Sequence, residues 1–212
     1  MKVLLINGSP NEKGCTYTAL NEIAQTLKTE DIDSEIYYIG TEPIAPCRDC
    51  RACTKLQKCV IDDKVNELLL RITEFDGFVI GSPVHYASAS GVISPFLDRL
   101  FFAGSRIPGE NPFRLKPGTA VVSCRRAGST ATLDQLNKYF LINQMPIISG
   151  RYWNMVHGST PEQVKKDLEG MQNMRIVAKN LAWHLKCKEA GEKLDIIPPK
   201  AEETIYTNFI RE

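Results

Sequence analysis

A regular alternation of short apolar runs and helix-period stripes constrains the fold of this chain more than any other feature. The first run, residues 3–6, is continuously apolar, which is typical of a strand buried on both faces of a parallel sheet. Further strands are predicted at 34–39, 77–80 and 119–122 and from 146 to 148, and the helical stripes between them lie near 20–27, 65–72, 92–100 and 133–140. This pattern predicts a doubly wound α/β fold, with a five-stranded parallel sheet and helices on both faces.

The 212 residues suit one compact domain. Ser159 or Thr160 is predicted to cap a last long helix, whose apolar stripe extends over residues 164–185. After Gly191 the periodicity fades, and Pro198-Pro199 is incompatible with a helix. We therefore expect a domain over residues 1–190 and a tail over 191–212, which is either loosely packed or reaches a neighbouring subunit.

Charge and hydropathy exclude several classes of protein. A formal net charge of +1 gives no basic field for nucleic-acid binding. The opening apolar run is too short for a signal peptide, and no later run approaches the length of a membrane span. We expect a cytoplasmic protein, where thiols stay reduced and a disulfide framework is disfavoured. The odd number of cysteines, seven, agrees with that expectation.

The loop GSPNEKGCTYTAL, residues 8–20, joins the first strand to the first helix. Its two glycines and its hydroxyls at Ser9, Thr16 and Thr18 predict a phosphate site at a helix N-terminus. No Lys-Ser/Thr pair follows Gly14, so the loop is not a nucleoside-triphosphate P-loop, and it lacks the G-x-G-x-x-G of a dinucleotide fold. The alternative is a glycine-rich turn with a capping threonine.

Two further loops follow predicted strands, and parallel strands place such loops at one edge of the sheet. GSPVHYASASG, residues 81–91, offers the rings of His85 and Tyr86 beside small residues, and suits a planar aromatic ligand. SCRRAGST, residues 123–130, offers backbone N–H groups and two arginines. Each loop alone has another interpretation, a pocket-rim histidine in the first case and a solvated basic turn in the second. Together the three loops predict a mononucleotide site.

GSPNEKGCT, GSPVHYASASGVISPFLDRL and RYWNMVHG resemble the flavodoxin-like NADPH-dependent FMN reductase family, over roughly residues 1–185. The resemblance implies a flavodoxin-like fold and FMN as the cofactor. It implies phosphate contacts at Ser9, Asn11, Cys15 and Thr16, with Pro10 shaping the turn. It implies that the isoalloxazine ring is lined by Pro83, Val84, His85, Tyr86 and Gly91, and its pyrimidine side by Ser123, Arg125, Arg126 and Gly128. Relatives often have a phenol or an indole where this chain has His85.

The segment PCRDCRACTKLQKC carries four cysteines, Cys47, Cys50, Cys53 and Cys59, within a loop at residues 43–60. It resembles the compact motif of the iron-sulfur flavoprotein branch of the family, which implies a [4Fe-4S] cluster. Thiolates at three-residue steps can wrap corners of a cubane, and the longer x5 segment lets the fourth reach round. Zinc usually takes two separated C-x2-C pairs, and four idle thiols remain the plainer alternative. Val60 after the last cysteine excludes ferredoxin spacing.

These observations predict an FMN-dependent oxidoreductase. Electrons would come from NAD(P)H, or from a one-electron protein donor such as ferredoxin through the cluster, and would pass to a quinone, an oxygen species or another small acceptor. No catalytic residue is assigned, and Tyr86 and His85 are the nearest candidates. The alternative is a non-enzymatic flavodoxin-type carrier, although 26 basic and 25 acidic residues do not give the one-signed surface common in such carriers. Relatives bury flavin near subunit interfaces, which implies a homodimer or homotetramer.

Overall fold

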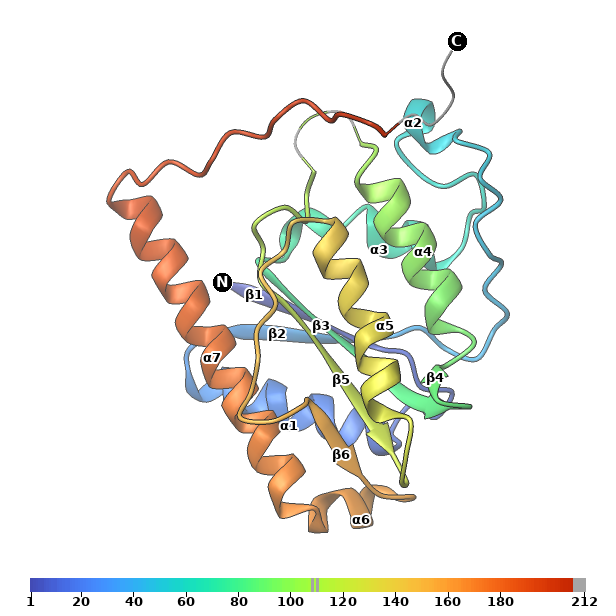
Figure 1. Ribbon diagram of the computed structural model, residues 1–212, viewed down its shortest axis with the longest axis vertical. Coiled ribbons are helices and arrows are strands. Elements are labelled where there is room, and N and C mark those ends of the chain that lie inside the picture. The colour runs from blue at the N-terminus through green and yellow to red at the C-terminus, as the bar shows by residue number, and fades with distance from the viewer. Residues whose placement is uncertain (108, 110, 208–212) are drawn as a thin grey trace.

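The computed structural model describes residues 1–107, 109 and 111–207. Its centre is a parallel sheet with the strand order β2-β1-β3-β5-β6 (Figure 1). The strands are β1 (Lys2–Asn7), β2 (Asp33–Tyr38), β3 (Gly77–His85), β5 (Gly118–Cys124) and β6 (Met155–His157), and β4 (Ser88–Ala89) pairs antiparallel with the end of β3. The predicted doubly wound five-stranded parallel sheet is confirmed.

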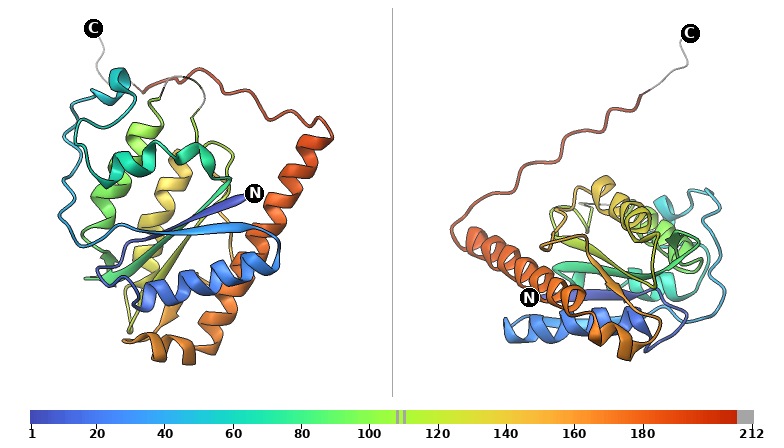
Figure 2. Two further views of the ribbon diagram at one scale, coloured as in Figure 1. Left: turned by 180° about the vertical axis from the view of Figure 1, so that it is seen from behind. Right: turned by 60° about the horizontal axis from the view of Figure 1, so that its bottom comes forward.

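Helices cover both faces of the sheet (Figure 2). One face carries α1 (Cys15–Thr29) and α7 (Leu168–Lys193), and the other carries α3 (Lys64–Leu69), α4 (Ile93–Gly104) and α5 (Ser129–Ile142). The side chains of β1 alternate between two apolar cores, because Leu4 and Ile6 belong to the second face whereas Val3 and Leu5 pack on the first. Short helical turns complete the fold: α2 (Cys53–Leu56), η1 (Ile72–Glu74) and α6 (Pro161–Lys166).

The fifth strand differs from the prediction in its position. Residues 146–148 make only a short contact with β5, where Gly118 N–H donates to Pro146 O at 2.9 Å and Ile148 N–H donates to Gly118 O at 2.8 Å. The chain then leaves the sheet and returns to pair as Met155–His157. The strand is therefore interrupted, and its regular part lies later than predicted.

The predicted last helix is two helices. The Thr160 side chain accepts from Gln163 N–H and caps α6, as predicted, but α6 ends at Lys166. Asp167 then caps α7 by accepting from Gly170 N–H at 2.9 Å. An acidic side chain that satisfies free N–H groups can begin a new helix within an apolar stripe, and the stripe alone does not show the break.

The C-terminal tail has no regular secondary structure from residue 195 to residue 207, and it continues as an extended segment from the end of α7 (Figure 2). Helix α7 continues past Gly191 to Lys193, slightly beyond the predicted domain end. The tail contacts the domain at Pro199, whose carbonyl oxygen accepts from Arg114 Nη2 at 2.6 Å. Among the described residues, no helix combines the length and apolar composition needed to cross a bilayer.

Candidate functional site

The register of the sheet brings the three predicted loops together. Asn7, at the end of β1, lies beside Gly81 of β3, and Pro83 of β3 lies beside Ser123 of β5. The loops that follow these neighbouring strands therefore share the carboxyl edge of the sheet, as predicted (Figure 1). That edge adjoins the N-termini of α1, α4 and α5.

The first loop leaves the N-terminus of α1 open. Gly14 occupies the N-cap position, and no side chain caps it. Ser9 is held in place because its N–H donates to Asn7 Oδ1 and its Oγ accepts from Asn11 N–H, both at 3.1 Å. Pro10 O accepts the hydroxyl of Tyr38 at 2.9 Å. First-turn N–H groups without a side-chain cap suit an anion, so this loop fits the terminal phosphate of a mononucleotide.

Two predicted phosphate residues contact other parts of the same edge. The Thr16 hydroxyl is buried and lies 2.8 Å from the Ser123 hydroxyl, which joins the first loop to the third. The Cys15 thiol lies 3.7 Å from Gly158 O, and burial raises the pKa of that thiol. Cys15 is therefore a neutral thiol beside the chain segment that follows β6.

The second loop is a tight β-hairpin. Strand β3 continues to His85, and Tyr86 and Ala87 form the turn with φ values of 50° and 57°. The exposed side chains of His85 and Tyr86 lie at this tip. Gln135 of α5 fixes the returning strand, because its Oε1 accepts from Ser88 Oγ at 2.7 Å and from Ala89 N–H at 2.9 Å. The hairpin is therefore held by α5 and is presented at the edge of the sheet.

A serine links the hairpin to the first loop. Ser90 is buried, its hydroxyl donates to Gly8 O at 2.5 Å, and its N–H donates to Ser82 Oγ at 3.0 Å. The adjacent Gly91 has open space around its Cα, where a Cβ would meet nothing within 4 Å. In the sequence Ser90 is only one of the small residues of this loop, and its bond to Gly8 is not predictable from the loop alone.

The third loop approaches the hairpin closely at Gly128. A Cβ at this position would lie 2.7 Å from Ala87 Cα, and Gly128 has a φ of 91°. Beside this contact is an open depression of about 540 Å³, lined by Val84, Tyr86, Ala87, Cys124, Arg125, Arg126 and Ala127. Such an open depression, with the hairpin on one side and the basic loop on the other, suits a flat ring with polar edges.

His157 and Cys124 are a pair at this edge that the sequence did not identify. The Cys124 thiol is buried and lies 3.4 Å from His157 Nδ1. The backbone N–H of His157 donates to Asp167 Oδ2 at 2.7 Å. Burial raises the pKa of the Cys124 thiol. Only the pairing of β5 with β6 brings these residues together, so their separation in the sequence concealed them.

The four cysteines of the loop at 43–60 line one pocket. Cys47 and Cys50 are exposed, Cys53 is buried at the start of α2, and Cys59 is half-buried. The other lining residues are Arg48, Arg51, Val60, Ile61, Arg99, Phe102 and Ala103. Within the described residues, the cysteines do not form a ready-made metal-ion site. The four thiols around this one pocket nevertheless match the donor set of an iron-sulfur cluster.

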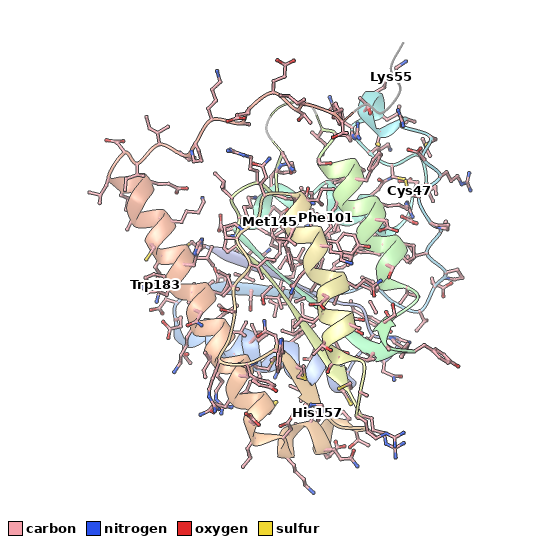
Figure 3. The ribbon with its side chains drawn as sticks, in the orientation of Figure 1. Cys47, Lys55, Phe101, Met145, His157 and Trp183 are labelled. Carbon is pink, nitrogen blue, oxygen red and sulfur yellow. The ribbon has the colours of Figure 1, made fainter. Side chains whose placement is uncertain are left out.

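The cysteine pocket is separate from the edge that carries the three loops. It lies against Arg99, Phe102 and Ala103 of α4, and the N-terminus of α4 follows the hairpin. At 1.5 Å per residue, Arg99 is about 9 Å and Ala103 about 15 Å along the axis from Ile93. Figure 3 shows Cys47 and Lys55 toward one end of the molecule and His157 toward the other.

These features define a flavodoxin-like α/β protein with three loops meeting at the carboxyl edge of its sheet and a distinct cysteine pocket. The model of the NADPH-dependent FMN reductase family matches residues 1–160 of the chain. The chain belongs to this family, and it is a flavin-dependent oxidoreductase.

Named relatives and solved structures agree with this assignment. An iron-sulfur flavoprotein of Methanocaldococcus jannaschii is 29% identical over 191 residues, which cover 88% of this chain and 98% of that protein. An iron-sulfur flavoprotein of Methanosarcina thermophila is 25% identical over 185 residues, which cover 85% of this chain and 93% of the relative. RosB with a bound flavin intermediate superposes with a TM-score of 0.68 at 14% identity, covering 100% of this chain and 94% of RosB, which supports the fold.

Proposed function

We propose that this FMN-dependent oxidoreductase takes electrons from NAD(P)H or from a one-electron donor protein and passes them to a small acceptor such as a quinone or an oxygen species. The assembly of the three loops at one edge carries the proposal. It offers an anion site at the end of α1 beside an open depression lined by Val84, Tyr86 and Arg125. Bound FMN supplies both hydride and single-electron chemistry at its ring.

The residues of the chain would bind and orient this cofactor. The first-turn N–H groups of α1 would hold the phosphate, with Ser9 and Asn11 keeping the loop in shape. The hairpin from Pro83 to Gly91 would support one face of the ring, and the loop from Ser123 to Gly128 would bond its polar edge. The open depression leaves room for a nicotinamide or an acceptor to reach the ring.

We also propose that Cys47, Cys50, Cys53 and Cys59 hold a [4Fe-4S] cluster. Their location around one pocket supports this assignment, and so do the names of the relatives. Such a group would supply single-electron transfer and would connect a protein donor such as ferredoxin to the flavin. The thiols must remain reduced to act as ligands, which suits a reducing compartment such as the cytoplasm.

A homodimer or homotetramer is the proposed assembly. The rings of Tyr152 and Trp153 are about half exposed, and they pack edge to face with centroids 4.3 Å apart. They line a pocket with His157, near the carboxyl edge of the sheet. A second copy of the chain would cover these rings, and aromatic residues of this kind are enriched in the centres of interfaces.

The test uses full-length protein made with iron and without air. We expect a flavin spectrum with broad cluster absorbance, acid-labile sulfide, and heat-released FMN on chromatography. Steady-state oxidation of NAD(P)H with a quinone would support the enzyme. Reduction by a protein donor without turnover of any small acceptor would instead favour the flavodoxin-type carrier. Protein without sulfide would refute the cluster while leaving the flavin assignment intact.

A further inference from the structure

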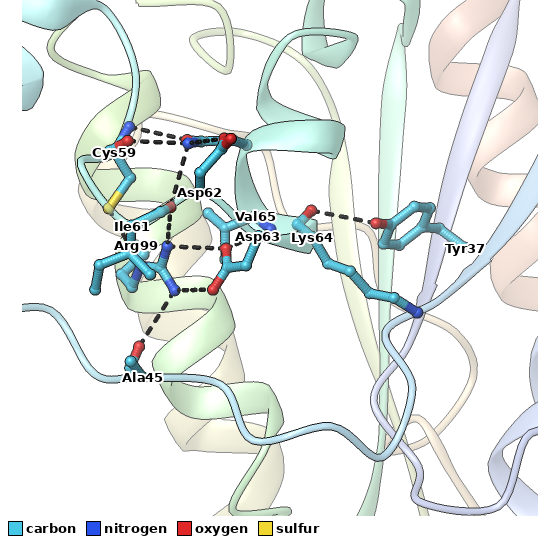
Figure 4. Close-up of polar contacts among 10 residues, drawn as sticks. Tyr37, Ala45, Cys59, Ile61, Asp62, Asp63, Lys64, Val65 and Arg99 are labelled. Atoms are coloured by element: carbon cyan, nitrogen blue, oxygen red, sulfur yellow. Dashed lines mark hydrogen bonds and ion pairs between the residues drawn. The ribbon is translucent and has the colours of Figure 1, made fainter.

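Arg99 is a buried arginine whose guanidinium lies against the cysteine loop (Figure 4). Its Nη1 donates to Asp63 Oδ2 at 2.6 Å and its Nη2 donates to Asp63 Oδ1 at 2.9 Å. Nη1 also donates to Ala45 O at 3.3 Å, and Nη2 to Ile61 O at 2.8 Å. The remaining donor, Nε, lies 3.3 Å from Cys59 Sγ. One side chain from α4 thus joins both ends of the cysteine loop.

Two sets of contacts hold Cys59 in place. Asn66 of α3 is buried, and it fixes the backbone of Cys59 by accepting from its N–H and donating to its carbonyl, both at 2.9 Å. Arg99 then fixes the sulfur of the same residue. Cys47 and Cys50, by contrast, are exposed. Cys59 is therefore more firmly positioned than the exposed Cys47 and Cys50.

The guanidinium is also oriented. Asp63 takes both Nη groups in a bidentate pair, so its negative charge lies on one side, while the Nε–H points to the sulfur. The additional donor directed at a sulfur places positive charge beside a predicted ligand, and hydrogen bonds to ligand sulfurs are one of the features that set cluster potentials.

We propose that Arg99 is a positioning residue for the cluster, which holds Cys59 in its ligating position and makes one-electron reduction of the cluster more favourable. This inference rests on the cluster proposed above. Reduction by dithionite adds one electron, and so one negative charge, to the iron-sulfur group. A guanidinium beside a ligand sulfur stabilises that added charge, and the carboxylate of Asp63 opposes it at longer range.

The experiment compares midpoint potentials of the cluster in anaerobic protein loaded with FMN. Arg99→Met removes the positive charge and is expected to lower the equilibrium constant for reduction about tenfold, which is about 59 mV for one electron. Asp63→Asn keeps an N-cap side chain for α3 but removes the opposing charge, so the potential should rise. Arg71→Met is the matched control, since Arg71 pairs with Glu35 and Glu74 and does not line the cysteine pocket.

Several outcomes would overturn the proposal. One is an Arg99→Met protein that has the sulfide content of the wild type and the same cluster potential as Arg71→Met. Another is a cluster potential that falls, instead of rising, in Asp63→Asn. Bound FMN reports folding independently of the cluster. If Arg99→Met does not fold, Arg99→Lys decides, because it keeps the charge but lacks the fork of donors. A lower content of acid-labile sulfide per bound FMN in Arg99→Lys would support the proposal. A sulfide content and a cluster potential equal to those of the wild type would contradict it. If wild-type protein contains no acid-labile sulfide, both this inference and the cluster proposal are wrong. If wild-type protein contains sulfide but the Arg99 variants behave like the control, only the role of Arg99 is wrong.

Discussion

The hydroxyl of Thr16 lies 2.8 Å from the hydroxyl of Ser123, and both residues are buried at the carboxyl edge of the sheet. Thr16 is in the first turn of α1, and Ser123 is near the end of β5. The contact joins the proposed phosphate loop to the loop proposed to meet the ring. A change at either residue should therefore affect the whole mononucleotide site.

Thr16→Val tests this link, since it nearly preserves the side-chain volume but removes the hydroxyl of Thr16. The hydroxyl of Ser123 then loses this hydrogen-bond partner. The implied hydrogen bond from Thr16 to the FMN phosphate is a bond to a charged group, and losing it costs about 1.5–3 kcal/mol, so FMN affinity should fall about tenfold to a hundredfold. Thr26→Val is the control, because Thr26 is buried in the same helix and donates to Glu22 O away from the site. Fluorescence titration of the apo-proteins with FMN measures the affinity of both variants. An equal FMN affinity for Thr16→Val and Thr26→Val would remove Thr16 from the site.

Gly128→Ala tests the close approach of the two ring loops. The new Cβ would require a left-handed backbone that alanine disfavours by about 1–2 kcal/mol, and it would also press on the backbone of Ala87. We expect a lower unfolding free energy and weaker FMN binding. Gly191→Ala should have the opposite sign, since this helical glycine has ordinary contacts and alanine is favoured there by about 0.5–1 kcal/mol. Urea unfolding compares the two, and an unperturbed Gly128→Ala protein would contradict the packing argument.

Cys50→Ser tests the separation of the two sites. If Cys50 is a ligand, the variant should lose most of its acid-labile sulfide and broad absorbance, and Ser substitutions at Cys47, Cys53 and Cys59 should behave alike. The FMN bands should persist, because the cysteine pocket lies along α4 away from the carboxyl edge. Cys187→Ser, on the exposed side of α7, is the control and should change neither the sulfide content nor the FMN bands. Loss of FMN together with sulfide would show that the sites depend on one another.

Glu35 should make the stability of the protein depend on acid pH. Hydrogen bonds from Arg71 at 2.8 Å, with a further bond from Lys2, lower the pKa of Glu35 to about 2. A carboxylate with a depressed folded-state pKa stabilises the fold above about pH 4.5, and this contribution is lost as the pH falls toward 2. Allowing for partial exposure, Glu35→Gln should cost about 1 kcal/mol at neutral pH.

The same difference should shrink when urea unfolding is repeated near pH 3. Glu203→Gln, in the exposed tail, is the control and should leave the unfolding free energy unchanged at both pH values. A cost for Glu35→Gln that is as large near pH 3 as at neutral pH would refute the assignment of the depressed pKa to this carboxylate.

The meeting of the three loops at one edge was predictable because it depends on periodicity and on a general rule of parallel sheets. Apolar runs of the right length identify buried strands, and the loops after neighbouring strands must meet at the same edge. The hairpin at Tyr86 and Ala87 was less accessible, since the sequence predicted that β3 ends at Ile80 whereas it continues to His85. The pairing that extends it depends on Gln135, a residue of a distant helix.

The sequence by itself determined the class of fold, the three loops at its edge and the grouping of the four cysteines. Only the tertiary structure decided that the cysteine pocket lies along α4, that β6 is interrupted, and that Arg99 faces Cys59 and Asp63. An arginine in an amphipathic stripe is ordinarily expected to reach solvent, because burying its charge is costly without partners. Two segments supply those partners, Ala45 on one side of the cysteines and Cys59, Ile61 and Asp63 on the other. Only the packing of the cysteine loop against α4 brings them within hydrogen-bonding distance of Arg99.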